Sequence, residues 1–269
     1  MSPAGADRPA AGAAAADGRR QGPAAPRRAV LGGALALAGA AAGFLWLSRE
    51  GLSFAAPAYE PVPGVPGLRR LAGEVRVTGL PAATIGLGGA GPALPAPLRA
   101  AAGARLAADP LATVHPPGAG TPPVTFFTAG GCPLCPRLSD RLADLGVTPA
   151  LRPLALFGPA SARAARAIVA AGRLAGPDAA ARLEGALVGT AFRTDDAFIR
   201  AVAAERGLDS AALLAAMDAP ETDAALAENH ALSAVLGLPG TPAVVVGRTL
   251  AVGLVPTGTL SRILEDEGA

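Results

Sequence analysis

The sequence predicts an α/β fold in which a long helical insertion separates two halves that contain strands. Three observations predict it. First, the apolar run VTFFT at 124–128 precedes an amphipathic helical pattern and a second apolar run. Second, residues 159–237 have a helical pattern almost throughout. Third, residues 242–267 follow the pattern of a β-hairpin and a final helix.

The first half is predicted to be a βαβ unit with parallel strands. After the strand at 124–128, apolar residues recur at spacings of three and four on one helix face. They are Cys135, Leu138, Leu142 and Leu145. The second strand, at 151–157, contains Pro153, which cannot donate a ladder hydrogen bond and therefore suits a sheet edge.

The insertion and the second half follow from turn and breaker signals. Breaks at Gly176-Pro177, Thr194, Gly207 to Ser210, and Pro220 divide residues 159–237 into about five helices. The strands predicted at 242–246 and 249–255 are joined by Gly247-Arg248, and glycine at the first loop position fits a tight hairpin turn. A helix at 257–267 completes the chain.

The N-terminal part is predicted to lie outside this fold. Residues 1–26 have the composition of a disordered cytoplasmic tail. In the segment 27–48, Arg27-Arg28 precedes an uncharged run of 20 residues, 29–48, about the length that crosses a bilayer. This pattern predicts a twin-arginine-like signal or a transmembrane anchor. The rest of the chain would then lie on the periplasmic face of a bacterial inner membrane, anchored or released after signal cleavage.

Residues 49–122 are interpreted as a linker and an N-terminal extension. Four prolines in 57–66 predict an extended linker. The alternation in 73–79 predicts a short strand, and residues 97–108 have a helical pattern. The pattern assigns no role to 80–122.

Composition excludes several functions. A net charge of +2 is too close to neutral for a nucleic-acid binder. Two cysteines cannot form a disulfide scaffold for 269 residues. A zinc site would need both cysteines and both histidines, His115 and His230, and their spacing matches zinc patterns poorly. His230 is expected at the solvated edge of a helix.

The two cysteines, Cys132 and Cys135, lie where the first strand meets the first helix. If Cys132 is the helix N-cap, its sulfur faces the N–H groups of Leu134 and Cys135, which stabilise a thiolate. Cys132 is then the accessible nucleophile, and Cys135, one turn further on the apolar face, is the buried resolving thiol. A structural clip or a metal clip remains an alternative for this motif.

A second signal is Gly240-Thr241-Pro242, just before the hairpin. Together with Cys132-Pro133-Leu134-Cys135 after VTFFT and the helical insertion, it resembles the DsbA-like thiol:disulfide oxidoreductases of the thioredoxin superfamily. The resemblance covers about residues 123–267. It implies a thioredoxin-like fold, in three parts: a first half with the Cys-x-x-Cys motif at 123–158, a helical insertion at 159–237, and a second half with a cis-proline loop at 238–269.

The resemblance also implies a function. Cys132 would attack, Cys135 would resolve, and Pro242 would be cis and lie beside the sulfurs. The backbone of Thr241 would pair with an extended substrate peptide. The redox-active disulfide would be the only redox group, with no further cofactor. The partners would be exported proteins with thiols, and a membrane redox partner of the DsbB type or a membrane electron donor.

The direction of exchange stays open at this point. An oxidant is the leading interpretation, and a reductase or isomerase would use the same residues. A non-catalytic protein, either a copper carrier or a chaperone, is the alternative from another class. The only methionines, Met1 and Met217, are distant from the cysteines, so the pattern typical of copper carriers is missing.

Three departures from the family pattern affect the expected chemistry. Pro133 and Leu134 separate the cysteines, whereas many members have histidine in the second position, so a milder oxidant is expected. The first strand has no acid, so a water would have to stand in beside Thr125 and assist proton transfer to Cys135. Pro136 cannot donate to the Cys132 carbonyl, so either the first turn is loosened or the regular helix begins near Pro136.

Overall fold

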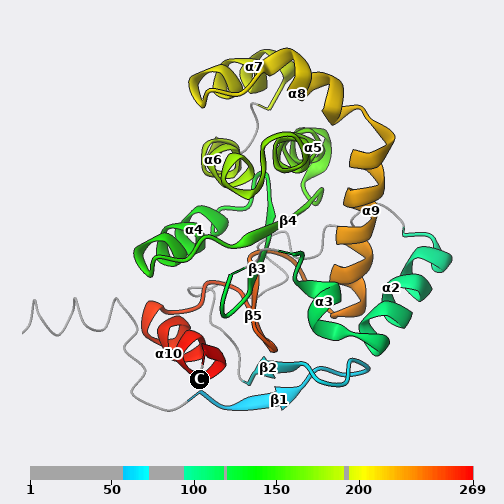
Figure 1. The fold of residues 1–269 in the computed structure, drawn as a ribbon, viewed down its shortest axis with the longest axis vertical. Coiled ribbons are helices and arrows are strands. Elements are labelled where there is room, and N and C mark those ends of the chain that lie inside the picture. The colour runs from blue at the N-terminus through cyan, green and yellow to red at the C-terminus, as the bar shows by residue number, and fades with distance from the viewer. Residues whose placement is uncertain (1–56, 73–93, 118–119, 191–193, 269) are drawn as a thin grey trace, which may run out of the picture. The chain divides into compact units, whose positions relative to one another are not determined.

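A mixed six-stranded sheet, in the order β1-β2-β6-β5-β3-β4, carries the fold (Figure 1). The structure is a computed structural model that describes residues 57–72, 94–117, 120–190 and 194–268. The strands are β1 (Tyr59–Pro61), β2 (Arg69–Leu71), β3 (Val124–Ala129), β4 (Ala150–Leu154), β5 (Ala243–Val246) and β6 (Thr249–Val252).

The predicted βαβ unit is confirmed. Strand β3 pairs in parallel with β4, and α4 (Cys135–Asp144) connects them. Pro153 lies in β4, which is an edge strand, where a missing N–H breaks no ladder bond. The apolar run of β3 is buried at every position, as expected for a strand covered on both faces.

Strand β4 ends at Leu154, earlier than the predicted end at 157, because the next backbone donors bond to side chains. The N–H of Ala155 donates to His230 Nε2 at 3.1 Å, and the N–H of Leu156 donates to Ser161 Oγ at 3.3 Å. His230, which was expected to be a solvated or edge residue, is half-buried at the end of this edge strand. Its ring terminates the edge strand.

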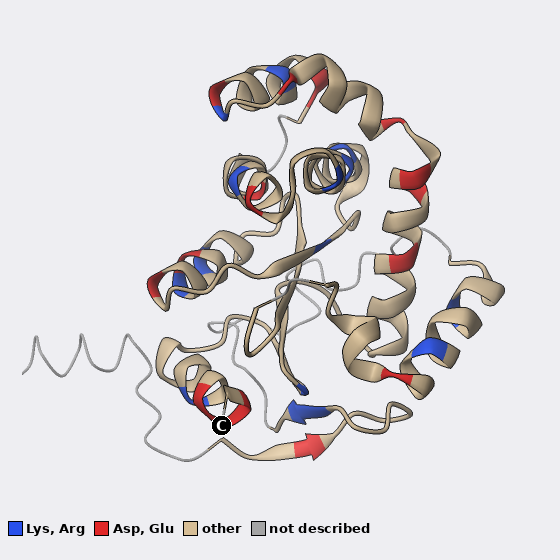
Figure 2. Cartoon of the chain, in the orientation of Figure 1, with Lys and Arg blue, Asp and Glu red and all other residues tan. Residues whose placement is uncertain are grey.

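The insertion contains the helices that the breaks predict. They are α5 (Gly158–Ala175), α6 (Pro177–Leu187), α7 (Asp196–Glu205), α8 (Ser210–Met217) and α9 (Pro220–Val235), with a 3₁₀ turn at Val188–Thr190. Figure 2 shows basic residues on α5 and acidic residues on α9, whereas α6 and α7 carry both kinds. Arg163 pairs with Asp196 and Asp218, and Arg166 pairs with Asp223. These ion pairs join α5 to α7, to the C-cap residue of α8 and to α9.

The second half supplies strands β5 and β6, which lie in the middle of the sheet. Strand β5 pairs antiparallel with β3 and with β6, and Gly247-Arg248 forms the predicted two-residue turn, with φ of 51° at Gly247. Strand β6 ends at Val252, before the predicted 255. The N–H of Gly253 still donates to Pro242 O at 2.7 Å, but Pro242 has no N–H with which to return the bond. The last helix is α10 (Thr257–Gly268). It lies with α4 on one side of the sheet, opposite α9 (Figure 1).

Part of the N-terminal extension belongs to the sheet. Strand β1, within the segment predicted as a linker, pairs with β2, which runs parallel to β6. The Arg69 guanidinium donates to Thr249 Oγ1 at 2.8 Å and to Glu267 Oε1 at 2.7 Å, which ties β2 to β6 and α10. The extension adds α2 (Ala96–Ala108), close to the predicted helix, and α3 (Pro110–Val114).

The predicted tail at 1–26, the signal or anchor at 27–48 and the strand at 73–79 lie outside the described residues. Of the helices in the described ranges, none combines the length and the apolar character that a membrane crossing requires.

Two histidine rings bond to the backbone, and of these His115 is buried and His230 is half-buried. His115 Nε2 lies 2.7 Å from Gly247 O and donates to it, and Nδ1 lies 2.8 Å from Thr125 Oγ1. His230 accepts the N–H of Ala155. Burial lowers the pKa of both rings.

We therefore expect stability to fall as the pH is lowered. The unfolded chain takes up protons near pH 6.5, before the folded protein does, so each histidine lowers the free energy of unfolding by up to about 1.4 kcal/mol per pH unit below that point. Chemical denaturation at pH about 7 and about 5.5 should show this loss, and His115→Gln should reduce it. Burial raises the pKa of Glu184, so this carboxyl stabilises the folded protein as the pH falls. Its effect is the same in the wild-type protein and in His115→Gln and does not alter the comparison. An unchanged pH dependence in the variant would contradict the prediction.

Candidate active site

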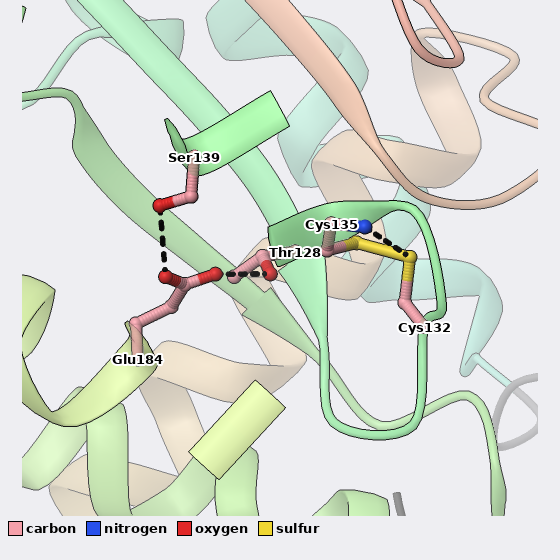
Figure 3. Close-up of a disulfide and its surroundings, with 5 residues drawn as sticks. All are labelled: Thr128, Cys132, Cys135, Ser139 and Glu184. Atoms are coloured by element: carbon pink, nitrogen blue, oxygen red, sulfur yellow. Dashed lines mark hydrogen bonds between the residues drawn. A yellow bond between two sulfur atoms is a disulfide. The ribbon is translucent and has the colours of Figure 1, made fainter. Parts of the chain in front are cut away.

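A disulfide joins Cys132 and Cys135 between the end of β3 and the start of α4 (Figure 3). The N–H of Cys132 donates to Ala129 O at 3.1 Å, which closes a turn directly after the strand. Gly131 within this turn has φ of 85°, a conformation that side-chain-bearing residues rarely adopt. The strand, the turn and the helix together place both sulfurs at one end of the sheet.

The prediction that Cys132 is the helix N-cap is wrong. Helix α4 begins at Cys135, and Leu134 takes the N-cap position. This matches the alternative of a late helix start, because Pro136 has no N–H to donate to the Cys132 carbonyl. One predicted donor remains: the N–H of Cys135 lies 3.2 Å from Cys132 Sγ. That donor can stabilise a thiolate at Cys132 after reduction.

Both sulfurs are buried in the oxidised protein. The exposed fraction is 1% for Cys132 and 0% for Cys135, so the expectation of an accessible sulfur at Cys132 is wrong for this state. The reason is that the loop packs Cys132 into the hydrophobic core, and only Pro133 of the motif is exposed. A substrate thiolate can reach Cys132 only after a local displacement of the atoms that cover it.

The proline loop lies at the same end of the sheet as the disulfide. The peptide bond between Thr241 and Pro242 is cis. Phe127 of β3 is paired with Ala243 of β5, so Pro242 follows the ladder towards the residues that precede Cys132. Gly240, Thr241 and Pro242 are all buried, and Thr241 Oγ1 has no hydrogen-bond partner in the described part of the chain.

A buried acid lies next to these elements, and sequence reasoning missed it. Glu184 of α6 is 1% exposed. It accepts a hydrogen bond from Thr128 Oγ1 of β3 at 2.8 Å and from Ser139 Oγ of α4 at 3.1 Å (Figure 3). Burial is the largest influence on this carboxyl and raises its pKa, and the two hydrogen bonds only partly offset that effect.

The expectation that Thr125 and a water are the only polar groups available near Cys135 is therefore corrected. Thr125 lies towards the other end of β3 and donates to Val114 O at 3.2 Å. A signal for Glu184 did exist in the sequence. It occupies the face of α6 on which Ala180, Leu183 and Leu187 are buried, where periodicity predicts an apolar residue.

The described residues contain no group of three or more His, Cys, Asp or Glu side chains that could hold a metal ion. His115 and His230, the histidines that a zinc site would require, bond instead to Gly247 O and to the N–H of Ala155. The two sulfurs are bonded to each other.

A Cys-x-x-Cys disulfide at the start of a helix, in a thioredoxin-like sheet with a cis-proline loop, defines the protein as a thiol:disulfide oxidoreductase. Residues 136–265 match the family model described as DSBA-like thioredoxin domain. The chain belongs to this family.

The chain is also similar to several solved structures. A thioredoxin-like oxidoreductase from Silicibacter pomeroyi is 30% identical over 53% of this chain and 84% of its own, with a TM-score of 0.47. ScsC from Proteus mirabilis is 27% identical over 54% of this chain and 82% of its own, with a TM-score of 0.48. The thiol-disulfide exchange protein alpha-DsbA2 from Wolbachia pipientis is 16% identical over 64% and 98%, with a TM-score of 0.52, which supports the fold. No curated protein matches the chain significantly.

Proposed function

We propose that this protein oxidises exported proteins by transferring the Cys132–Cys135 disulfide to their thiols. The observation that carries the proposal is the disulfide itself, placed at the start of α4 in a DSBA-like domain. The bond is local and closes only a short loop, so its contribution to the stability of the fold is smaller than that of a long-range bridge. The disulfide lies at the start of a helix, where a backbone N–H can stabilise the thiolate that exchange produces.

The exchange proceeds in two steps. A substrate thiolate attacks Cys132 Sγ, the bond to Cys135 breaks, and the electron pair stays on Cys135, which takes up a proton. A second substrate thiolate then attacks the substrate sulfur of the mixed disulfide and releases Cys132 as a thiolate. The substrate loses two electrons and the enzyme gains them.

Cys132 is proposed as the sulfur attacked because it lies in the loop, whereas Cys135 lies inside the first helical turn. The N–H of Cys135 bonds to Cys132 Sγ and makes it the better leaving thiolate in the second step. Leu134 adds no charge to stabilise that thiolate, so a moderate oxidant is proposed. Gly240, Thr241 and Pro242 would present a backbone edge to an extended substrate peptide.

The proposed location is the periplasmic face of the membrane, with residues 29–48 as the signal or anchor. There a membrane partner of the DsbB type would reoxidise the protein, or a membrane electron donor would keep it reduced. The partner determines the direction, because about 30 mV of potential difference already gives a tenfold preference.

Trapping in cells tests the direction. Cys135→Ala leaves Cys132 without its resolving thiol. Mixed disulfides should therefore accumulate at Cys132, either when its thiolate attacks a disulfide of an exported protein or when a substrate thiolate displaces glutathione from a Cys132 that glutathione disulfide has oxidised. For an oxidant, the trapped proteins should lose their native disulfides when the gene is deleted. If instead they gain disulfides on deletion, the protein is a reductase. The double variant Cys132→Ser with Cys135→Ala is the control and should trap nothing.

Equilibration with glutathione provides an independent measurement. The oxidised fraction of Cys132–Cys135 is measured over a series of glutathione redox buffers after acid quenching and alkylation. An oxidant should be substantially reduced at ratios at which thioredoxin-type reductases stay oxidised. A protein that never exchanges with glutathione would contradict disulfide exchange altogether.

A further inference from the structure

Arg137 is a cation in the first turn of α4, two residues beyond Cys135. Its side chain is exposed and forms no ion pair with the acids of the described ranges. The first turn of α4 contains no acid, and the positive end of the helix dipole disfavours a cation there. Neither the helix nor its packing therefore explains the arginine, and residues that break a local rule in this way are typical of functional sites.

Arg137 lies about one turn from Pro133, the exposed residue of the Cys-x-x-Cys motif. The backbone is already helical at the N-cap residue Leu134, where φ is −101° and ψ is −18°. Residues four apart share one face of a helix, and side chains on a helix lean towards its N-terminus. The guanidinium of Arg137 therefore extends over the turn that contains Pro133, and Cys132 is the residue directly before that proline.

The other described segments next to the disulfide have no exposed charge. A recess beside Gly130 and Gly131 is lined by residues of α5, of α6 and of the segment before α7, and none of them is charged. The proline loop at 240–242 is also uncharged. Glu184 is buried, and burial raises the pKa of its carboxyl, which favours the neutral form. Among these segments and the first turn of α4, Arg137 is thus the one exposed charge.

We propose that Arg137 determines specificity by favouring substrate thiols that are flanked by carboxylates. The inference rests on the proposed function, because it concerns the substrate that opens the disulfide. In that step a substrate thiolate bonds to Cys132 Sγ, the bond between Cys132 and Cys135 breaks, and its electron pair stays on Cys135. Acidic residues beside the substrate cysteine bring further negative charge to this place, and Arg137 attracts it.

An exposed charge acts on the encounter with the substrate rather than on the bonds that form and break. A charge at the rim of a binding surface changes the association rate and its salt dependence. Its range is set by the Debye length, about 10 Å at 0.1 M salt and about 3 Å at 1 M. The preference for acidic substrates should therefore be present at low salt and disappear at high salt.

Three blocked tripeptides, Glu-Cys-Glu, Gln-Cys-Gln and Lys-Cys-Lys, provide the test. Each is added in excess to the oxidised full-length protein, and the rate at which it opens the Cys132–Cys135 bond is measured by acid quenching and mass spectrometry. Each rate is divided by the fraction of the peptide present as thiolate, because neighbouring charges change the pKa of the peptide thiol. The specificity ratio is the corrected rate of the acidic peptide over that of the neutral one.

In the wild-type protein at about 0.1 M salt, the acidic peptide should react faster than the neutral one. Arg137→Gln should lower the specificity ratio about two- to fivefold, and Arg137→Glu should make Lys-Cys-Lys the fastest of the three peptides. At about 1 M salt the variants and the wild-type protein should have the same ratio. Both rates in a ratio come from the same protein, so a change in stability cancels.

Arg173→Gln is the matched control. Arg173 is also exposed and forms no ion pair with the described acids, and its loss changes the net charge by the same amount. It lies in the last turn of α5, twelve residues beyond Ser161, which borders Gly130. At about 1.5 Å per residue this is about 18 Å along the helix, beyond the Debye length at 0.1 M salt. The ratio should stay at the wild-type value.

The outcomes separate this inference from the proposed function. A wild-type protein that none of the three peptides can reduce would contradict disulfide exchange itself. If the wild-type protein is reduced but Arg137→Gln keeps its specificity ratio at about 0.1 M salt, Arg137 has no role in specificity and the exchange activity stands. An equal fall of the ratio in Arg137→Gln and Arg173→Gln would also overturn the proposal, in favour of an effect of net charge.

Discussion

Replacement of Cys132 by serine is expected to reduce the catalysed oxidation of a reduced, unfolded protein substrate to the uncatalysed rate. A serine hydroxyl forms no disulfide, and the remaining sulfur of Cys135 is fully buried inside the first turn of α4. Cys135→Ala should also lose turnover, but for another reason. It retains the sulfur that substrates attack, so once Cys132 has been converted to a mixed disulfide with glutathione, one substrate thiolate should displace the glutathione as a thiolate and each enzyme should stop at one mixed disulfide.

A comparison of Cys132→Ser with Cys135→Ala cancels the effect that loss of the disulfide has on stability. Both lose the same disulfide, which closes so short a loop that the chain-entropy model assigns it only about 2 kcal/mol. Any difference between them therefore reports on the two sulfurs. The measurement is the yield of mixed disulfide on a non-reducing gel, together with the rate of substrate oxidation. Mixed disulfides at Cys135 in the Cys132→Ser protein would show that the roles of the two cysteines are reversed.

Gly130→Ala is expected to destabilise the protein by about 1–3 kcal/mol, because the loop before Cys132 has no room for a methyl group. An added Cβ would lie 2.8 Å from Ala164 Cβ and 3.3 Å from Ser161 Cα, both in α5. The second of these atoms is backbone, so the helix must move as a unit. The displaced loop would carry Cys132 with it, so a slower exchange rate should accompany the loss of stability.

A double-mutant cycle tests this explanation. Ala164→Gly removes the nearest atom, and by itself should cost about 1 kcal/mol through lower helix propensity. If the clash is the cause, the two changes together should destabilise less than the sum of their separate effects. Gly185→Ala in α6 is the control, because its Cβ would meet nothing within 4 Å, and it should be neutral or stabilising. Additive effects in the cycle would mean that Ala164 is not the obstacle.

Much of the fold could be predicted because its signals are local. The run at 124–128 and the helix with its leucines at spacings of three and four appear as β3 and α4. Breakers such as Gly176 and Pro220 mark the ends of the inserted helices. Each of these features depends on residues within a few positions of one another, so the sequence alone displays it.

The strands of the N-terminal extension could not be predicted in the same way. Strands β1 and β2 have only three residues each, too few to show a period. Strand β2 is held by contacts of Arg69 with Thr249 and Glu267, which are 180 and 198 positions away in the chain. Nothing near Arg69 in the sequence indicates those partners.

The candidate site likewise contains some residues that local sequence patterns predict and others that they do not. The positions of Cys132, Cys135 and Pro242 relative to strands and helices follow from local patterns, and so does the class of chemistry. Glu184 does not, because its partners Thr128 and Ser139 are 56 and 45 residues away. The burial of Cys132 is likewise a result of packing by segments that are distant along the chain.

By itself, therefore, the sequence determined the order of strands, helices and thiols, since hydrophobic periodicity and chain-breaking residues act over one or two turns. Only the tertiary structure decided that an acid from the insertion lies beside the disulfide and that both sulfurs are buried. The physical reason is that burial and side-chain hydrogen bonding depend on which surfaces meet, and the meeting of α6 with β3 and α4 is set by packing across the whole domain.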